Sequence, residues 1–449
     1  MTNRKARDLS RRRVLGGSAA ALTVLAVCGC SRTRPGTGTG RAAPAQASLV
    51  PNVRVSRDAF PVHGEPYLAA NPADERNLLG ACSVYQGAQR SVATYASFDG
   101  GVSWRNNGPL PIGLADVTGN LTAGNVTVAF DSRGRGFVCA VAGNGQTQRG
   151  GIQLWRTDDG GRSFAPPVTA ATGFLDHPGL AAGRSPGAAG NLYLAATYFA
   201  TPRDGRLVFC RSTDAGRSFE PKRYLDPGSG TRGRLPVIAA GPHGTVCVMY
   251  FVAMPDGSNL VKVISSQDHG RTFAAPAQLT RVIPAPAVAG VTVRSCPAIA
   301  ADPAGDRVHA AVAGYDVAAS LSQVQLFTSP DQGRSWNPPA VLAASTRVTY
   351  MQPQVAVASD GRVAVSVFAL ARDRVNVLLF VSDRQQRFGR PLQVTSQGFD
   401  PAYGPGNSAG EHWIGGYQGL AATSSGFHPF WNDTRTGHME IFTATVPAS

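Results

Sequence analysis

Titratable and aromatic side chains stand at one repeated place in this sequence, at or just before a Pro-x-aliphatic-Ala motif. The motif keeps its proline five times, as in Pro66-Tyr67-Leu68-Ala69, and recurs twice without it. Equivalent positions of a repeat lie at equivalent places in space, so we expect these side chains to converge on one polar ligand site. The alternative is a wet channel lined by polar residues for solvation alone. The residues are His63, Glu65, Asn125, Asp176, His177, Arg234, Arg294, Cys296, Tyr350, Gln352 and Tyr417, with Glu411 and His412 slightly upstream.

A second repeated motif indicates the architecture that holds these residues in place. The stretch Ser97-Phe98-Asp99-Gly100-Gly101-Val102-Ser103-Trp104 returns in four further near-complete copies and one degenerate copy. Its aspartates recur every 52 to 63 residues. A fixed period of this size indicates an array of similar units, with propeller blades as the leading candidate. We call these stretches the aspartate turns, and their aspartates are Asp99, Asp159, Asp214, Asp268, Asp331 and Asp383.

The aspartate turns have a structural interpretation. An Asp side chain accepts hydrogen bonds from backbone N–H groups a few residues later, and Gly two residues on supplies positive φ at little steric cost. Each turn follows a β-rich run such as Val324-Gln325-Leu326-Phe327, which predicts a hairpin. Catalysis or metal binding is the alternative role. Six copies spread around an array do not all line one active site, so we interpret these aspartates as turn-closing.

The strand pattern predicts an all-β propeller of four-stranded antiparallel blades, over residues 49–449. The Pro-x-aliphatic-Ala positions give seven units, and the seventh, from Tyr417 to Val446, has three strands and no aspartate turn. The run Val50 to Val55 has no unit of its own, so we expect it to supply the missing strand beside Glu440 to Val446 and close the ring. Seven blades are favoured, and six are the alternative.

The aspartate turns resemble the Asp box, or BNR repeat, of the sialidase-like β-propellers, over about Glu65 to Val446. Five near-complete copies make the resemblance specific for architecture. It is less specific for activity, because Asp boxes also occur in propellers that are not sialidases. Sialidase propellers have six blades, which is the reason for retaining six as the alternative.

The resemblance implies a catalytic set. Sialidases clamp a substrate carboxylate with three arginines, and use a Tyr nucleophile assisted by a Glu with an Asp as acid/base. Their first arginine lies in a motif that reads Gly64-Glu65-Pro66-Tyr67 here, so that arginine is absent. The implied catalytic candidates are Glu65, Asp176, Tyr350 and Tyr417, and the ligand-binding candidates are Arg234, Arg294, His177, Gln352 and Glu411. No metal or cofactor is expected, and whether the protein is an enzyme stays open.

The N-terminal residues are interpreted as an export signal. Ser10-Arg11-Arg12-Arg13-Val14-Leu15 resembles a twin-arginine signal, and Val27-Cys28-Gly29-Cys30 resembles a bacterial lipobox. The resemblance implies removal of residues 1–29, lipidation of Cys30, and a protein tethered to the outer face of the cytoplasmic membrane. An uncleaved N-terminal anchor is the alternative. Residues 30–48 contain few large apolar side chains and are expected to form a flexible linker.

The formal net charge is +14, and it is scattered rather than concentrated in a run. Outside the membrane this charge suggests contact with acidic glycans or anionic wall polymers rather than nucleic acid. A solvated Arg-rich surface is the alternative. We expect a monomer with free core cysteines. Two hypotheses follow: a glycan-binding protein or glycoside hydrolase of the exo-sialidase type, and a non-catalytic surface scaffold that binds protein or wall polymer.

Overall fold

The computed structural model describes residues 50–114, 117–201, 204–230, 232–406 and 411–447. The predicted signal segment 1–29 and the whole predicted linker 30–48, including Cys30, therefore lie outside the described residues, as does residue 49 at the start of the predicted propeller domain. Helical structure in the described ranges is limited to single 3-10 turns, none long enough or apolar enough to cross a membrane. These turns are η1 (Pro186–Ala188), η2 (Pro227–Ser229), η3 (Pro242–Gly244) and η4 (Pro401–Tyr403).

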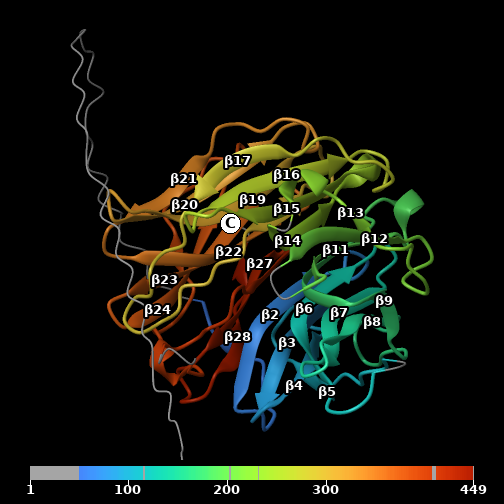
Figure 1. Cartoon of the computed structure of the whole chain (residues 1–449). Helices are drawn as coiled ribbons and strands as arrows, with labels where there is room; N and C mark the ends of the chain where they lie inside the picture. Colours follow the sequence, from blue (N-terminus) through green and yellow to red (C-terminus); the bar gives the residue numbers. More distant parts are fainter. Residues whose placement is uncertain (1–49, 115–116, 202–203, 231, 407–410, 448–449) are drawn as a thin grey trace, which may run out of the picture. The chain divides into compact units, whose positions relative to one another are not determined.

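Seven antiparallel sheets make up the described chain, and six take four consecutive strands in sequence order. Figure 1 labels most of these strands. Their bounds are β2 (Val62–Ala70), β3 (Leu78–Gln86), β4 (Gln89–Ser97) and β5 (Arg105–Pro109) in blade 1; β6 (Thr122–Phe130), β7 (Gly136–Asn144), β8 (Arg149–Thr157) and β9 (Val168–Thr172) in blade 2; and β10 (Phe174–Ala182), β11 (Leu192–Phe199), β12 (Gly205–Ser212) and β13 (Arg223–Tyr224) in blade 3.

The second half of the ring repeats this order. Its strands are β14 (Gly233–Ala240), β15 (Val246–Ala253), β16 (Asn259–Ser266) and β17 (Ala277–Val282) in blade 4; β18 (Ala298–Ala301), β19 (Val308–Asp316), β20 (Leu321–Ser329) and β21 (Ala340–Ser345) in blade 5; β22 (Thr349–Val357), β23 (Val363–Ala371), β24 (Arg374–Val381) and β25 (Leu392–Gln393) in blade 6; and β26 (Gly419–Thr423), β27 (Gly426–Asp433), β28 (Glu440–Thr443), β29 (Val446–Pro447) and β1 (Val53–Arg54) in blade 7.

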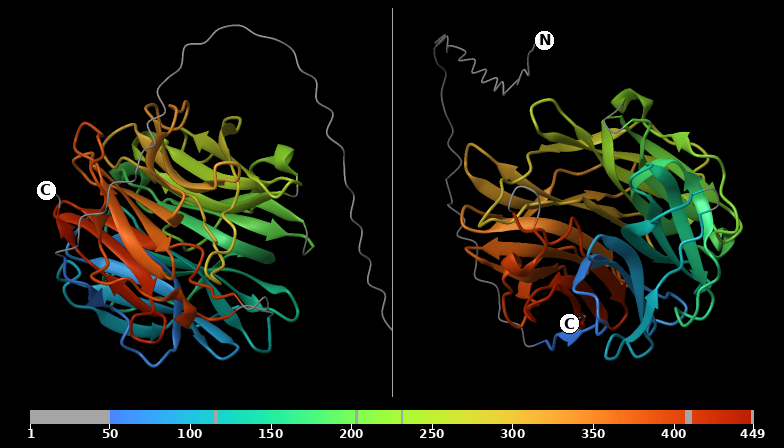
Figure 2. Two further views of the ribbon diagram at one scale, coloured as in Figure 1. Left: turned by 90° about the vertical axis from the view of Figure 1, so that its left-hand side faces the viewer. Right: turned by 60° about the horizontal axis from the view of Figure 1, so that its bottom comes forward.

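The first strands of the blades form a closed inner ring. Each of β2, β6, β10, β14, β18, β22 and β26 contacts the next, and β26 contacts β2. Figure 2 shows the blades following one another in sequence order until the red C-terminal strands meet the blue N-terminal ones. The buried apolar side chains form seven clusters, and each cluster lies between two neighbouring blades. The prediction of an all-β propeller with seven blades is confirmed, and the six-bladed alternative is excluded.

The N-terminal strand closes the ring, as predicted. β1 pairs with β28 in register Val53↔Thr443 and Arg54↔Phe442, and the Val55 N–H then donates to the Ile441 carbonyl at 2.8 Å. The paired strand is shorter than the predicted run from Val50 to Val55. Because β28 would otherwise be an unpaired edge, this pairing completes the blade and protects its backbone groups.

A buried polar cluster secures the closure. The His63 ring nitrogens face two oxygen acceptors, the Met439 carbonyl at 3.0 Å and the Asp58 carboxylate at 2.8 Å. Asp58 also accepts from the Tyr95 hydroxyl at 2.7 Å. Burial alone would raise the Asp58 pKa, but the hydrogen bond and charge of His63 outweigh it and hold that pKa at about 2. His63 was expected near the ring site, and the structure places it here, wholly buried in the closure.

The aspartate turns join the third and fourth strands of their blades. In the first, Ser97 Oγ donates to Asp99 at 2.8 Å, and Asp99 accepts the N–H of Ser103 at 2.9 Å. The degenerate sixth copy has no such serine pair, and the Arg387 guanidinium instead donates to Asp383 at 2.7 Å. The carboxylates therefore hold short turns between strands by local hydrogen bonds.

Candidate functional site

Five innermost strands carry a β-bulge at the position directly before the Pro-x-aliphatic-Ala motif. The strand register shifts there in β2, β6, β10, β14 and β22. Each bulge holds a non-glycine residue at positive φ, between 49° and 56°, which L side chains adopt rarely and mostly where surrounding structure enforces it. Four of the five precede proline, which cannot donate into the strand ladder. The residues are Glu65, Asn125, His177, Leu235 and Gln352.

The bulges border a central cavity of about 530 Å³ at one end of the inner ring. Four of the five bulge residues line it, and Gln352 does not. Bulges of this kind commonly redirect side chains near functional sites. The polar lining side chains are Glu65, Tyr85, Arg90, Asn125, Asp176, His177, Arg234, Asn259, Arg294, Ser295, Tyr350 and Trp413.

Three arginines from distant parts of the sequence line this cavity. Arg234 lies on β14, Arg294 lies in the loop between β17 and β18, and Arg90 lies on β4. Neither Arg234 nor Arg294 makes a hydrogen bond or ion pair to any residue in the described ranges, and both are exposed. Guanidinium groups in this state are free to take a carboxylate or sulfate in two-pronged fashion.

Arg90 is held more tightly than the other two arginines. Its Nη2 donates to the Asn125 side-chain oxygen, lies 3.4 Å from Ser83 Oγ and 3.6 Å from Glu65 Oε2. Its Nε is buried and has no hydrogen-bond partner. The guanidinium packs against Gly124, where an added Cβ would clash with Nε, so this buried N–H is a destabilising unpaired donor and not a contact point for a ligand.

Two carboxyl groups share the cavity, and their pKa values move in opposite directions. Burial raises the pKa of Glu65 from its ordinary value, and the charge of Asp176 adds to that rise, although Arg90 and His177 oppose it. Burial would also raise the pKa of Asp176, but the adjacent His177 lowers it. One carboxyl is therefore biased toward the acid and the other toward the carboxylate, the usual arrangement for divided acid and base roles.

Asp176 and His177 form an ion pair, with His177 Nδ1 2.9 Å from Asp176 Oδ2. Asp176 also accepts from the His177 backbone N–H at 2.9 Å and from the Asn125 side-chain amide. Burial alone would lower the pKa of His177, but Asp176 and then Glu65 raise it overall. The bulge in β10 thus presents a paired carboxylate and imidazole to the cavity.

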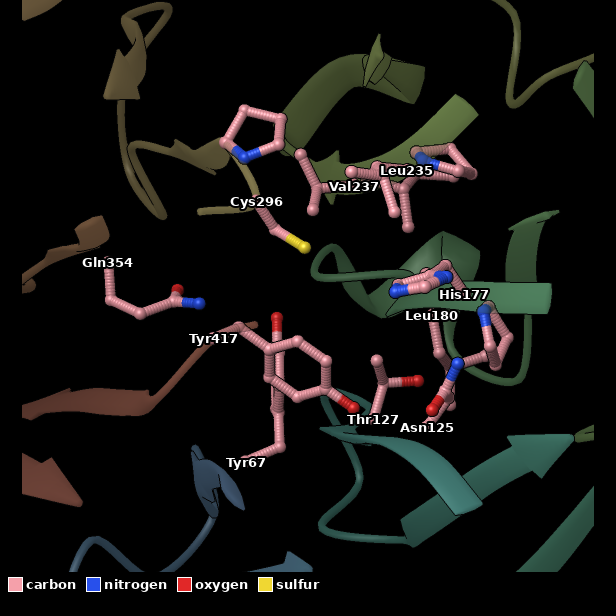
Figure 3. A pocket seen from close by; sticks show the side chains of 15 residues that line it. Tyr67, Asn125, Thr127, His177, Leu180, Leu235, Val237, Cys296, Gln354 and Tyr417 are labelled. Carbon is pink, nitrogen blue, oxygen red and sulfur yellow. The ribbon is translucent and has the colours of Figure 1, made fainter. Parts of the chain in front are cut away.

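The two candidate tyrosines differ in placement. Tyr350 lines the central cavity, and burial raises its pKa. Tyr417 lies below it in a narrow extension of about 30 Å³, where its ring meets Tyr67 edge-on at 6.3 Å between ring centres (Figure 3). The Tyr417 hydroxyl donates to the Val126 carbonyl at 3.1 Å, and burial raises its pKa well above the ordinary value. Tyr417 thus fills the narrow extension of the cavity, and its hydroxyl is already hydrogen-bonded to Val126.

The described parts of two long connections build one wall of the cavity, residues 283–297 between blades 4 and 5 and residues 394–406 and 411–418 between blades 6 and 7. The Thr292 N–H donates to the His412 carbonyl at 2.9 Å, and Glu411 accepts from the Thr292 hydroxyl at 2.7 Å. Gln352 is fully buried and donates to the Gly415 carbonyl at 2.7 Å. Glu411 and Gln352, expected as ligand contacts, therefore support the wall and do not line the cavity.

Most predicted site residues meet in the cavity, but several lining residues were not anticipated. Glu65, Asp176, His177, Arg234, Arg294 and Tyr350 line it, whereas Tyr417, Gln352 and Glu411 do not. The unanticipated residues that bear most on the chemistry are Arg90, Tyr85 and Trp413. Arg90 and Tyr85 face each other across β3 and β4, outside the innermost strand on which the sequence pattern was based. None of the six aspartates of the turns lines the cavity.

The remaining titratable groups give no metal site. Among the described residues there is no group of three or more His, Cys, Asp or Glu side chains arranged to hold a metal ion. The cysteines within those ranges, Cys82, Cys139, Cys210, Cys247 and Cys296, are buried free thiols. Burial raises the pKa of Cys296 at the cavity floor, which leaves it a protonated thiol.

No protein-family model matches the sequence, and no curated protein matches it. Solved structures share the fold at low identity. A polysaccharide lyase, an ulvan lyase bound to -[GlcA(1-4)Rha3S]-, is 12% identical with a TM-score of 0.51, covering 88% of this chain and 96% of that one. A Hadza microbial sialidase is 16% identical with a TM-score of 0.47, and the match covers 68% of this chain and 63% of the sialidase. An α-L-arabinofuranosidase of Fusarium graminearum in complex with arabinobiose is 13% identical with a TM-score of 0.47, covering 88% and 97%. The likeness to the lyase supports the propeller fold.

Proposed function

We propose that the protein binds a carboxylate-bearing glycan in the central cavity and hydrolyses a glycosidic bond of that glycan outside the cell, tethered by a lipid on Cys30. The observation that carries the proposal is the convergence of Arg90, Arg234 and Arg294 on one cavity that also holds Glu65 and Asp176. The ulvan lyase of similar fold is bound to a chain containing glucuronate, which is a carboxylate-bearing sugar.

The arginines select the charge of the ligand. Arg234 and Arg294 have no partner in the described chain, so an incoming carboxylate does not have to displace an existing ion pair. Arg90 is already bonded to Asn125 and close to Glu65, so it contributes positive charge to the cavity more than free donors. An Arg–carboxylate contact is charge-assisted and contributes about 1.5–3 kcal/mol, so the two free arginines dominate affinity in this proposal.

The carboxyl groups divide the chemistry. Glu65, whose raised pKa keeps its proton at higher pH, donates that proton to the leaving glycosidic oxygen. Asp176, ionised and paired with His177, accepts the proton of the water that attacks the anomeric carbon. The bond from the anomeric carbon to the leaving oxygen breaks as the bond to water forms. No tyrosine nucleophile is needed, and the Tyr417 hydroxyl is already bonded to Val126.

A non-catalytic glycan-binding propeller is the second candidate. The engaged Tyr417 hydroxyl favours it, since this tyrosine is then withdrawn from the role that the sialidase resemblance implied. Under this alternative the arginines still bind the acidic sugar, and Glu65 and Asp176 only shape the cavity. Binding and turnover therefore have to be measured separately.

The test combines calorimetry with product analysis. Glucuronic acid and N-acetylneuraminic acid are titrated into wild type, Arg234→Ala, Arg294→Ala and the control Arg232→Ala, an exposed arginine two residues from Arg234 that does not line the cavity. Each cavity variant is expected to weaken binding roughly 10- to 150-fold, with the control unchanged. No binding of either acid by wild type would overturn the proposal.

Turnover is measured on a panel of acidic polysaccharides and sialosides, by release of reducing ends. Glu65→Gln and Asp176→Asn should each lower the rate at least 100-fold while binding persists. Binding without any release in wild type would establish the non-catalytic alternative. Products with an unsaturated ring, detected by ultraviolet absorbance, would show that the reaction is elimination and not hydrolysis.

A further inference from the structure

A second cavity of about 400 Å³ adjoins the central cavity on the side of blade 1 that faces blade 7. The two cavities share three lining residues, Tyr85, Arg294 and Trp413. The two cavities therefore adjoin at these side chains. A ligand that binds Arg294 in the central cavity and is long enough to reach the second cavity would pass along Trp413.

Trp413 offers an available aromatic face and donor there. It is partly exposed, and its indole N–H has no hydrogen-bond partner within the described ranges. The indole N–H groups of Trp104, Trp155 and Trp431 each donate to a protein acceptor, at 3.1, 2.8 and 2.9 Å, and that of Trp336 is also unpaired in the described chain but is buried away from solvent. Tyr85 meets Trp413 edge-on at 6.1 Å between ring centres, so the two rings form a corner. An aromatic face with a free polar edge suits the apolar C–H face and hydroxyl groups of a sugar ring.

The position of Trp413 is held before any ligand arrives. Its backbone N–H donates to the Pro405 carbonyl at 2.9 Å, and the next residue's carbonyl accepts from the Asn432 amide at 3.1 Å. The indole packs over Gly64, where a Cβ would lie only 3.0 Å from two ring carbons. Any larger residue at this place would push the indole away. A pre-positioned contact of this kind loses little entropy on binding.

The charge of the second cavity differs from that of the central one. Its other lining residues are Pro61, Val62, Gly87, Thr292, Pro405 and Gly406, which carry no charge. Its single ionic side chain is Arg294, at the boundary with the central cavity. The lining thus suits an uncharged ring next to a charged one.

We propose that the second cavity is a subsite for an uncharged sugar ring linked to the acidic ring in the central cavity, with Trp413 as its stacking surface. The inference rests on the proposed function and narrows its substrate class to oligosaccharides in which an acidic sugar is followed by a neutral one. Apolar surface buried on the indole then adds to the affinity that the arginines supply.

The experiment compares chain lengths by calorimetry. The probes are glucuronic acid and N-acetylneuraminic acid, each free and each linked to one neutral hexose, with the hexose of the glucuronate series attached at C1 or at C4. Wild type should bind at least one disaccharide about tenfold more tightly than its free acid. Trp413→Ala should remove that increment and leave the affinity for the free acid within about twofold.

Two further variants separate the subsite from the charged site. Gly64→Ala, which displaces the indole without removing it, should also reduce the increment, and Arg234→Ala should weaken free acid and disaccharide alike. Tyr224→Ala, an exposed aromatic far along the sequence on β13, is the control and should change neither affinity. If wild type binds free acids and disaccharides equally, or if Trp413→Ala weakens both to the same extent, the subsite is wrong while the proposed function stands. If no probe binds, the proposed function itself fails.

Discussion

Arg90 lies directly opposite Tyr85 in the register of β3 and β4, and its guanidinium carbon is 5.6 Å from the centre of the tyrosine ring. The pair spans the two cavities, because Arg90 lines the central one and Tyr85 lines both. A cation over an aromatic face is attracted by the ring's quadrupole. Blade 1 therefore contributes an arginine to the cavity from its third strand, although the first strand of that blade has none at the corresponding place.

The arrangement of Arg90 predicts a strong preference for arginine over lysine. Arg90→Lys keeps one positive charge but loses the planar group that reaches Asn125, Ser83 and Glu65 at once. We expect about tenfold weaker binding of glucuronic acid, which corresponds to about 1.4 kcal/mol. Calorimetry measures it, with Arg232→Lys as the charge-matched control. Equal affinity in wild type and Arg90→Lys would show that only net charge matters here.

Glu65 should make the folded state less stable at neutral pH. The Glu65 pKa is higher in the folded state than its ordinary value of 4.5. The protonated side chain therefore contributes fully to the free energy of unfolding below pH 4.5, and this contribution is lost as the pH rises through the raised pKa. Glu65→Gln should therefore raise the melting temperature at pH 7 and leave it almost unchanged at pH 4. If the proposed function is right, the same substitution removes the descending high-pH limb of activity. A lower melting temperature for Glu65→Gln at pH 7 would contradict the buried-acid interpretation.

The opposite sign holds for Asp58 in the ring closure. Its pKa is lowered to about 2, so its contribution is fully present above the ordinary value of 3.8 and is lost as pH falls through about 2. Asp58→Asn leaves the buried His63 without its carboxylate partner, and we expect a loss of about 3 kcal/mol at pH 7. Urea unfolding at pH 7 and pH 2 measures the difference, with the turn residue Asp74→Asn as control. A loss that does not shrink at pH 2 would place its origin outside the ion pair.

The aspartate turns should affect stability and not binding. Asp214 accepts from Ser212 Oγ, from the Ser218 N–H and from Ser218 Oγ. Removing these bonds in Asp214→Ala should cost about 1–2 kcal/mol, because Ser218 is exposed to water and only the Ser212 hydroxyl is left buried. Affinity for acidic sugars should stay within twofold in the same calorimetric assay. Weaker binding with an unchanged unfolding curve would give Asp214 a functional role.

Membrane attachment through Cys30 stays a prediction from the sequence. Cys30→Ser should release the protein into the medium, and Arg11→Lys combined with Arg12→Lys should block export, because each removes the group that the implied machinery reads. Cell fractionation with detection of the full chain measures both. Wild-type amounts in the membrane fraction for both variants would refute the lipoprotein interpretation.

The blade count could be predicted because its determinants are local. Each Pro-x-aliphatic-Ala motif marks one innermost strand, and each aspartate turn is closed by bonds within a few residues. The pairing of β1 with β28 could also be predicted, since a blade with three strands and a run without a blade complement each other. The same local motif led to Glu65, Asp176, His177 and Arg234, which lie at or beside the bulges.

The rest of the site depends on contacts between distant segments, which no local pattern reveals. Arg90 reaches the cavity because it stands opposite Tyr85 near the end of a hairpin. Trp413 and Arg294 line the same cavities because two loops more than a hundred residues apart bond to each other, and Glu411 and Gln352 hold those loops in place. Tyr417 shares the position of the other ring residues in sequence, but its side chain points into the channel below, where Figure 3 shows it beside Tyr67.

Blade 7 combines β1 with β28, so its sheet joins residues about 390 positions apart in the chain. During synthesis the ring cannot close until Thr443 has left the ribosome, and until then β28 does not exist to receive Val53. The early blades can form before then, but the ring is not closed. His63 and Asp58 still lack the segment with Met439 and Glu440, which His63 contacts in the complete fold. A chain stalled before that segment would expose the edge of β27 and would lack the pairing of β1 with β28. The segment near Thr443 thus decides when Val53 finds its partner strand, so the ring closes only after blade 7 has been synthesised.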